Sequence, residues 1–125
     1  MGAGIPPFIF NLPLSIFNWF TSEENMVNIT YKNGVVTAML YGEIDHHIAP
    51  QIRGDIDAQC ERSRPSRLVL DFGKVGFMDS SGIGLVMGRY RMISLLGGKL
   101  EVVNVPPNLQ KIFVLSGLEN LGVMK

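Results

Sequence analysis

A short apolar segment between two longer periodic segments constrains the fold of this chain most. Residues 67–72 (RLVLDF) follow Pro65 and form a nearly continuous apolar run. Runs of this kind are typical of strands in the middle of a sheet whose faces are covered by helices. Residues 67–72 are therefore expected to form a central strand.

The segments on either side of this strand have the periodicity of helices. Before it, apolar residues recur every four positions from Ile48 to Cys60, which predicts an amphipathic helix with Cys60 as a small core residue. After it, residues 81–96 predict a second helix that ends at Gly97-Gly98. Its expected buried stripe comprises Ile83, Val86, Met87, Tyr90 and Ile93. Arg89 and Arg91 are expected on a solvated face, with the presentation of positive charge to an acidic partner as the alternative.

The remaining segments complete an alternating order of strands and helices. Residues 27–31 and 35–41 alternate around Asn33-Gly34, which predicts a hairpin with a type I′ turn. Residues 99–105 predict another strand, and Pro106-Pro107 opens a third helix that ends at Gly117. The expected order is ββαβαβα followed by a short tail.

This order predicts a single α/β domain. We expect a mixed sheet of four to five strands with an opening hairpin, parallel central strands joined by right-handed crossovers, and three to four helices. With so few helices, one face of the sheet is expected to be less covered and available to a partner.

Residues 1–25 differ in composition from the rest of the chain. They hold four of the seven Phe and the only Trp but no basic residue, since the first is Lys32. A secretory signal needs a basic start, and the Pro and Asn residues within residues 5–20 argue against a membrane span. We expect the domain to be residues 26–125, and residues 1–25 to be a tag, upstream-derived sequence or an apolar tail that packs on a protein or membrane surface.

Charge and cysteine content exclude several functions. Lys plus Arg and Asp plus Glu each number 11, so no global basic field is available to hold nucleic acid. The single cysteine forms neither an internal disulfide nor a multi-cysteine metal site. A cytoplasmic location and the absence of a cofactor or metal are the default expectations.

Residues 76–84 (GFMDSSGIG) are the segment most indicative of function. They lie between the central strand and the second helix, where open α/β sheets place their sites. Asp79, Ser80 and Ser81 are also good helix N-caps, so capping alone would explain them. Capping does not explain Gly82 and Gly84, which lower helix propensity and call for close packing or a closely approaching partner.

Three motifs in order resemble bacterial anti-sigma factor antagonists of the STAS domain type. The motifs are Met78 to Gly84 followed by Gly88-Arg89-Tyr90, the earlier segment 42–47 (GEIDHH), and the later segment 115–118 (LSGL). The resemblance covers about residues 27–122. Within the family, the Asp-His-His and Gly-Arg-Tyr pieces are most similar to antagonists of the sporulation anti-sigma F factor, and general-stress antagonists are the nearest paralogues.

The resemblance implies a phosphorylation switch at Ser81. The unmodified protein would bind a partner that is both anti-sigma factor and serine kinase, which would release the sigma factor, and a phosphatase would reset Ser81. It also implies that the residues around Ser81 contact the partner, and we expect His46 and His47 to lie at the same rim of the sheet. The expected partner-binding residues are Asp79, Ser80, Gly82, Ile83, His46 and His47.

Other functions fit the sequence less well. Ser81, the two histidines and nearby aspartates supply the residue types of a hydrolase triad, but Asp79 stands where a nucleophile elbow needs glycine. Two adjacent histidines are too few for a metal phosphoesterase. No phosphate-binding glycine motif occurs, so nucleotide binding would be weak, and the protein is expected not to be an enzyme.

Overall fold

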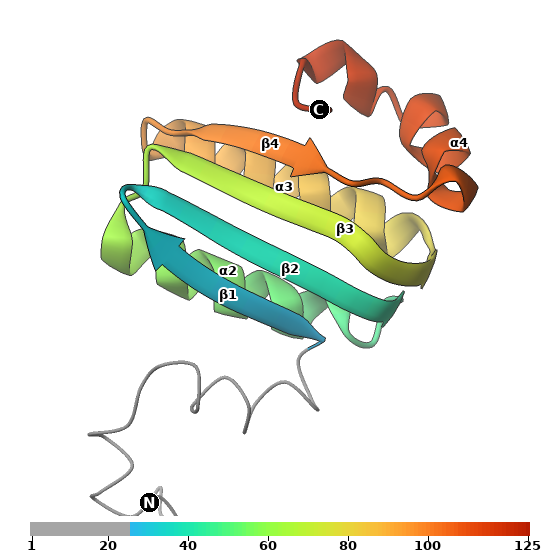
Figure 1. Cartoon of the computed structure of the whole chain (residues 1–125), viewed down its shortest axis with the longest axis horizontal. Helices are drawn as coiled ribbons and strands as arrows, with labels where there is room; N and C mark the ends of the chain where they lie inside the picture. The colour runs from blue at the N-terminus through green and yellow to red at the C-terminus, as the bar shows by residue number, and fades with distance from the viewer. Residues whose placement is uncertain (1–25) are drawn as a thin grey trace, which may run out of the picture.

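The computed structural model describes residues 26–125, and Figure 1 shows their arrangement. Predictions for residues 1–25 lie outside the described residues. The order of elements is β1 (Val27–Lys32), β2 (Val35–Ile44), α2 (Ala49–Ser63), β3 (Arg67–Met78), α3 (Ser80–Leu95), β4 (Lys99–Val103), α4 (Pro107–Leu115) and the 3₁₀ turn η2 (Leu118–Leu121). This order confirms the expected alternation.

The chain opens with the predicted hairpin. β1 and β2 pair antiparallel, from Lys32 opposite Val35 to Val27 opposite Leu40. The turn between them has positive φ at both Asn33 (52°) and Gly34 (81°), as a type I′ turn requires. The hairpin is therefore set by local sequence.

The sheet is mixed, with the order β1-β2-β3-β4. β3 pairs parallel with both β2 and β4, which confirms residues 67–72 as part of an internal strand. The prediction that this strand ends near Phe72 was wrong, because it continues to Met78. β2 is also longer than expected and supplies pairing partners up to Ile44 opposite Met78, with two register shifts on the way.

The two long helices lie on one face of the sheet (Figure 1). The buried side chains of α2 are Ala49, Ile52, Ile56 and Cys60, as the four-residue spacing predicts. The core between these helices and the sheet includes alternate residues of β2 and the apolar run of β3, with Phe72 packed edge-on against Phe113 of α4.

The buried side of α3 differs from the prediction. Its buried residues are Gly82, Leu85, Val86, Arg89 and Ile93. Ile83, Met87 and Tyr90 are only partly buried, and Arg89 was wrongly placed on a solvated face. The physical reason is that α3 packs against α2 as well as the sheet, so its buried arc is turned toward α2.

The C-terminal segment returns to the sheet. Gly117 has a φ of 82° and separates α4 from η2. Met124 then forms an isolated parallel bridge with Val102, in which the Lys125 amide donates to the Val102 carbonyl at 2.8 Å. The sheet thus has four strands and a bridge, within the expected range of four to five.

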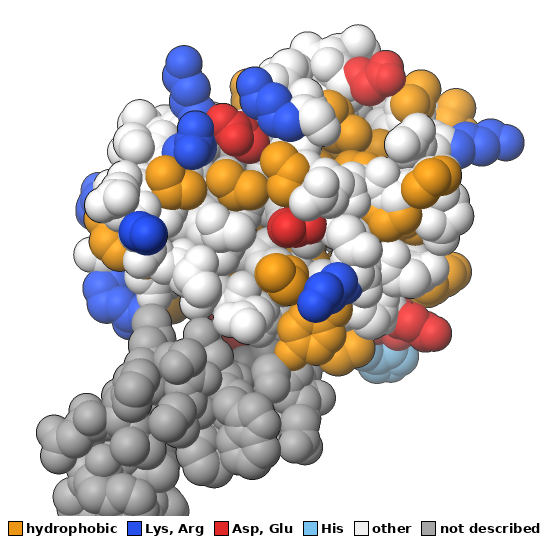
Figure 2. Space-filling model, viewed as in Figure 1, with side chains coloured by type: hydrophobic (Ala, Val, Ile, Leu, Met, Phe, Trp, Pro, Cys, Tyr) orange, Lys and Arg blue, Asp and Glu red, His pale blue; other side chains and the backbone are white. Residues whose placement is uncertain are grey.

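The opposite face of the sheet has no helix of the described chain over it. Figure 2 views this face, on which hydrophobic side chains are interspersed with charged ones and most of the basic side chains lie toward the left of the view. Among residues 26–125, no helix has the length and apolar character needed to cross a membrane.

Candidate functional site

The candidate site lies at one edge of the sheet, where β2 and β3 end. Ile44 and Met78 are opposite each other in the last pair of the parallel ladder, and the Asp79 amide donates to the Ile44 carbonyl at 3.1 Å. The loop after β2 carries His46 and His47, and the turn after β3 carries Asp79 to Ser81. Parallel pairing thus brings together two motifs that are about 35 residues apart in the sequence.

Asp79 begins α3 as its N-cap. Its backbone is extended (φ −99°, ψ −170°), and its carboxylate Oδ1 accepts a hydrogen bond from the Ser81 amide at 2.8 Å. This satisfies one of the amides that the first helical turn leaves free. Capping is therefore an observed role of Asp79, whatever contact it makes with a partner.

The two serines of the motif differ in exposure. Ser80 is exposed and Ser81 is half-buried, both in the first turn of α3. The Ser81 hydroxyl makes no hydrogen bond to any residue that the structure describes. A free hydroxyl at a helix N-terminus is suited to modification, because an attached phosphate would meet the free amides and the positive end of the helix dipole.

The glycines after Ser81 have two different environments. A Cβ on Gly82 would lie 2.2 Å from Cγ and Sδ of Met78, so Gly82 permits close packing of α3 on β3. Gly82 is buried, and a partner contact at this position stays a prediction. A Cβ on Gly84 would meet nothing within 4 Å, and Ile83 between them is partly buried.

The loop before α2 is held by Asp45. Its Oδ1 accepts hydrogen bonds from the amides of His47 at 2.9 Å and Ile48 at 3.2 Å. The hydrogen bond from His47 is the main cause of a lowered pKa at Asp45. Both histidines are exposed, and their ring centroids lie 4.1 Å apart. Asp45 thereby holds the loop that carries both histidines.

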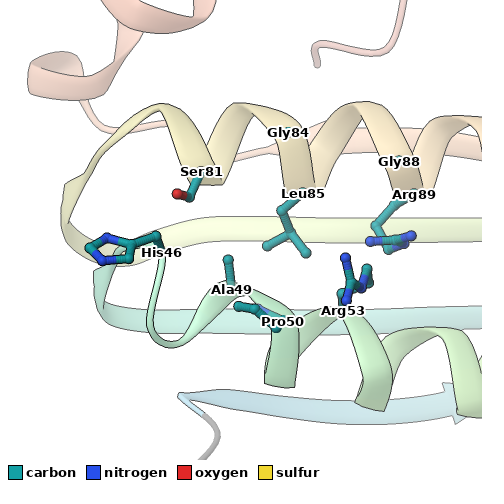
Figure 3. Close-up of a pocket in the computed structure, with 9 residues that line it drawn as sticks. All are labelled: His46, Ala49, Pro50, Arg53, Ser81, Gly84, Leu85, Gly88 and Arg89. Carbon is teal, nitrogen blue, oxygen red and sulfur yellow. The ribbon is translucent and has the colours of Figure 1, made fainter.

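A groove of about 400 Å³ lies between residues 49–53 of α2 and residues 81–89 of α3. His46 and Ser81 both line this groove, which confirms that His46 lies beside Ser81. His47 is not among the residues that line the groove. Figure 3 shows His46 and Ser81 toward one end and Arg53 and Arg89 toward the other. The full lining is His46, Ala49, Pro50, Arg53, Ser81, Gly84, Leu85, Gly88 and Arg89.

An ion pair joins the two helices at the far end of the groove. Arg89 Nε lies 2.7 Å from Asp57 Oδ1, and the arginine side chain is only 7% exposed. Burial lowers the pKa of Arg89 and raises that of Asp57, while each charge opposes the shift of the other. Sequence reasoning missed this buried arginine. Its signal was the four-residue spacing of Leu85, Arg89 and Ile93, all of which are buried.

The geometry does not assemble a catalytic triad among residues 26–125. Asp79 accepts from the backbone of Ser81, and the nearest carboxylate contact of a histidine joins His47 Nδ1 to Asp45 at 3.8 Å. No hydrogen bond links Ser81 to either histidine in this part of the chain. No described residue is thus hydrogen-bonded to the Ser81 hydroxyl as the base that nucleophilic catalysis uses.

Comparison with known proteins identifies the family. The sequence model of the STAS domain family matches residues 26–124. An anti-sigma F factor antagonist of Paenibacillus polymyxa is 35% identical over 92 residues, which cover 74% of this chain and 79% of the relative. An anti-sigma-B factor antagonist of Bacillus subtilis is 28% identical and covers 76% and 85% of the two chains.

Solved structures agree with these matches. The anti-sigma factor antagonist SpoIIAA in its unphosphorylated form has a TM-score of 0.71 at 33% identity, over 79% of this chain and 85% of that one. SpoIIAA from Bacillus in its phosphorylated form has a TM-score of 0.65 at the same identity, over 79% and 88%. This chain therefore belongs to the STAS domain family and is homologous to anti-sigma factor antagonists.

Proposed function

We propose that this protein is an anti-sigma factor antagonist that is switched by phosphorylation of Ser81. The unmodified form binds an anti-sigma factor that is also a serine kinase, which releases the sigma factor, here sigma F. Phosphorylation of Ser81 weakens this binding, and a separate serine phosphatase restores it. The protein acts in the cytoplasm by binding, without catalysing a reaction or holding a cofactor.

The observation that carries the proposal is the environment of Ser81. Ser81 is half-buried and lies in the first turn of a helix capped by Asp79, and its hydroxyl forms no hydrogen bond with the described residues. A kinase can therefore reach it without unfolding α3. The relative SpoIIAA has been solved in both an unphosphorylated and a phosphorylated form, which supports the same chemistry here.

Phosphorylation at this position would alter the surface and leave the helix intact. A phosphoserine carries a charge of about −1.5 to −2, and at a helix N-terminus this charge is stabilised by free amides and the helix dipole. The added bulk and charge would instead oppose a partner that docks on the rim. The rim presents Ser80, His46 and His47, and Phe77, which precedes Ser80 in the sequence, is 52% exposed.

Intact mass spectrometry would test the switch. The chain is incubated with ATP and the host's anti-sigma kinase, beside the variants Ser81→Ala and Ser80→Ala. We expect one phosphoryl group on the natural chain and on Ser80→Ala, and none on Ser81→Ala. Because Ser80 is the neighbouring exposed serine, loss of phosphorylation in Ser80→Ala alone would contradict the assignment.

The similarity to an anti-sigma-B factor antagonist favours a second candidate, a STAS-type interaction module in a general-stress system, with weak nucleotide binding as a further property. Binding of the unmodified chain to purified anti-sigma F and anti-sigma B factors, with and without ATP, separates the two. Tighter binding to the anti-sigma F factor supports the first proposal, and preference for the anti-sigma B factor supports the second.

A membrane contact is proposed only for residues 5–20, which lie outside the described residues. If these residues form an apolar tail that binds lipid, removal of residues 1–25 should abolish cosedimentation with vesicles and leave anti-sigma factor binding unchanged. Unchanged cosedimentation would assign any lipid binding to the domain itself.

A further inference from the structure

Arg89 has a hydrogen-bonding group that the fold leaves unsatisfied. The residue is 5% exposed, and its Nε is paired with Asp57. Its Nη1, however, is fully buried and has no hydrogen-bond partner among residues 26–125. A buried donor on a charged group is costly to leave unpaired. The guanidinium therefore has the capacity to bind an acceptor from outside the described chain.

The space beside this group is the groove between α2 and α3. Arg89 and Arg53 both line it, and Figure 3 shows their guanidinium groups close together at the same end. Burial lowers the pKa of Arg89, and the nearby positive charge of Arg53 lowers it further. Asp57 is the one carboxylate that pairs with either guanidinium in the described part of the chain. Two guanidinium groups with one carboxylate leave an excess of positive charge, which an oxyanion would neutralise.

The rest of the groove is suited to an apolar group. Ala49, Pro50 and Leu85 lie between the arginines and Ser81 in Figure 3. On the α3 side, Gly84 and Gly88 each have open space where a Cβ would be, so internal packing does not account for them. Each costs helix stability of about 1 kcal/mol relative to alanine. The distance along α3 from Ser81 to Arg89 is about 12 Å, the length of a small organic molecule.

We propose that this groove binds a small organic anion. Its phosphate or carboxylate group would accept hydrogen bonds from Arg89 Nη1 and Arg53, and its apolar body would lie over Leu85 toward Ser81. The buried, unpartnered nitrogen of Arg89 carries the inference, and the volume and lining of the groove support it. The site requires no anti-sigma factor, so it stands independently of the proposed function.

NMR titration of the full chain tests the site with defined probes. Phenyl phosphate and benzoate combine an oxyanion with an apolar ring, inorganic phosphate lacks the ring, and benzyl alcohol lacks the charge. We expect shifts of the Gly84 and Gly88 amides and of the Arg89 Nε–H with the two ring anions, in the millimolar range, and weaker shifts with phosphate. The ring anion that binds more tightly shows whether the site prefers a phosphate or a carboxylate.

The proposal is overturned if the ring anions cause no shifts, if benzyl alcohol causes the same shifts, or if the shifts lie outside the groove. Arg53→Gln keeps the fold, because Arg53 is exposed and forms no ion pair with a described residue, and it should weaken binding about tenfold. Unchanged affinity in Arg53→Gln would also overturn the proposal.

A matched pair of glycine variants tests the location. Gly88→Leu should fill the groove and abolish binding, whereas Gly54→Leu, on the exposed part of α2 with equally open surroundings, should bind like the natural chain. Equal binding by both variants would place the ligand elsewhere. None of these measurements involves the kinase, so failure here and failure of the phosphorylation switch are separate results.

Discussion

The helices α2 and α3 begin at the same edge of the sheet, and an aspartate precedes each of them. The two helices nevertheless differ in the side chains that they bury and in what they supply to the groove. Each is preceded by an aspartate whose carboxylate accepts backbone amides, Asp45 before α2 and Asp79 before α3. α2 then buries apolar and titratable side chains, including Cys60, and its Asp57 faces α3. α3 buries Gly82 and an arginine. The comparison shows that α2 supplies much of the core and the counter-charge, and that α3 supplies the serine and the open side of the groove.

The largest expected effect comes from the ion pair between the helices. Asp57→Asn should lower the free energy of unfolding by about 3 kcal/mol, because it leaves the buried Arg89 without a charged partner. Urea unfolding measures the change. Asp55→Asn is the control, since Asp55 is also half-buried on α2 but forms no ion pair with a described residue, and burial raises its pKa. Equal losses in both variants would show that the pair contributes nothing specific.

The next expected effect is a loss of stability at high pH that arises from a single residue of α2. Burial raises the pKa of Cys60 from 9.0 to about 11. The folded state therefore keeps the thiol proton at pH values where the unfolded chain releases it, so stability is full below pH 9 and falls as the pH rises toward 11. The loss should reach about 2 to 3 kcal/mol.

Urea unfolding at a series of pH values measures how stability falls with pH in the natural chain and in Cys60→Ala. The variant loses some packing at every pH but should lose less stability between pH 9 and 11 than the natural chain. Parallel pH profiles of the two proteins would rule out the thiol as the source of the slope.

Alanine substitutions at two glycines of α3 are expected to change stability by smaller amounts and in opposite directions. Gly82→Ala should cost about 1 to 3 kcal/mol, because the new methyl group would overlap the Met78 side chain. Gly84→Ala should instead stabilise the protein by up to about 1 kcal/mol, since its surroundings are open and alanine favours the helix. Thermal or urea unfolding of the two variants gives the comparison, and changes of the same sign would refute the packing role of Gly82.

The smallest expected change in the free energy of unfolding comes from removing the aspartates that precede the two helices. Asp79→Ala should lower the free energy of unfolding by about 1 kcal/mol, the usual cost of losing an N-cap. Asp45→Ala should cost less, because the hydrogen bond from the His47 amide to Asp45 is exposed whereas that from Ser81 to Asp79 is partly buried, and because Asp45 is not the N-cap of α2. Urea unfolding at neutral pH measures both, and a greater loss in Asp45→Ala would reverse the proposed order.

Much of the fold follows from local sequence. The Asn33-Gly34 turn fixed the hairpin, the apolar run of residues 67–72 marked an internal strand, and the spacing from Ile52 to Cys60 identified the buried side of α2. The motif around Ser81 was correctly placed at the start of a helix. These features depend on backbone conformation and periodicity, which neighbouring residues determine.

The extent of β3 and the buried side of α3 were not evident from the sequence. Residues 73–78 contain two glycines and a lysine, and they form a strand because β2 continues beside them to Ile44. The stripe of Ile83, Met87 and Tyr90 is only partly buried, because α3 packs against α2 as well as the sheet. A hydrophobic pattern shows which side of a helix is apolar, but not which second element it meets.

The sequence by itself determined the order of elements, their turns and the family to which the chain belongs. Only the tertiary structure decided that Arg89 is buried opposite Asp57, that His46 and Ser81 line one groove, and that Gly84 and Gly88 line the same groove. The physical reason is that burial of a charge depends on a partner brought by another element, and 32 residues separate Asp57 from Arg89. No local pattern contains that information.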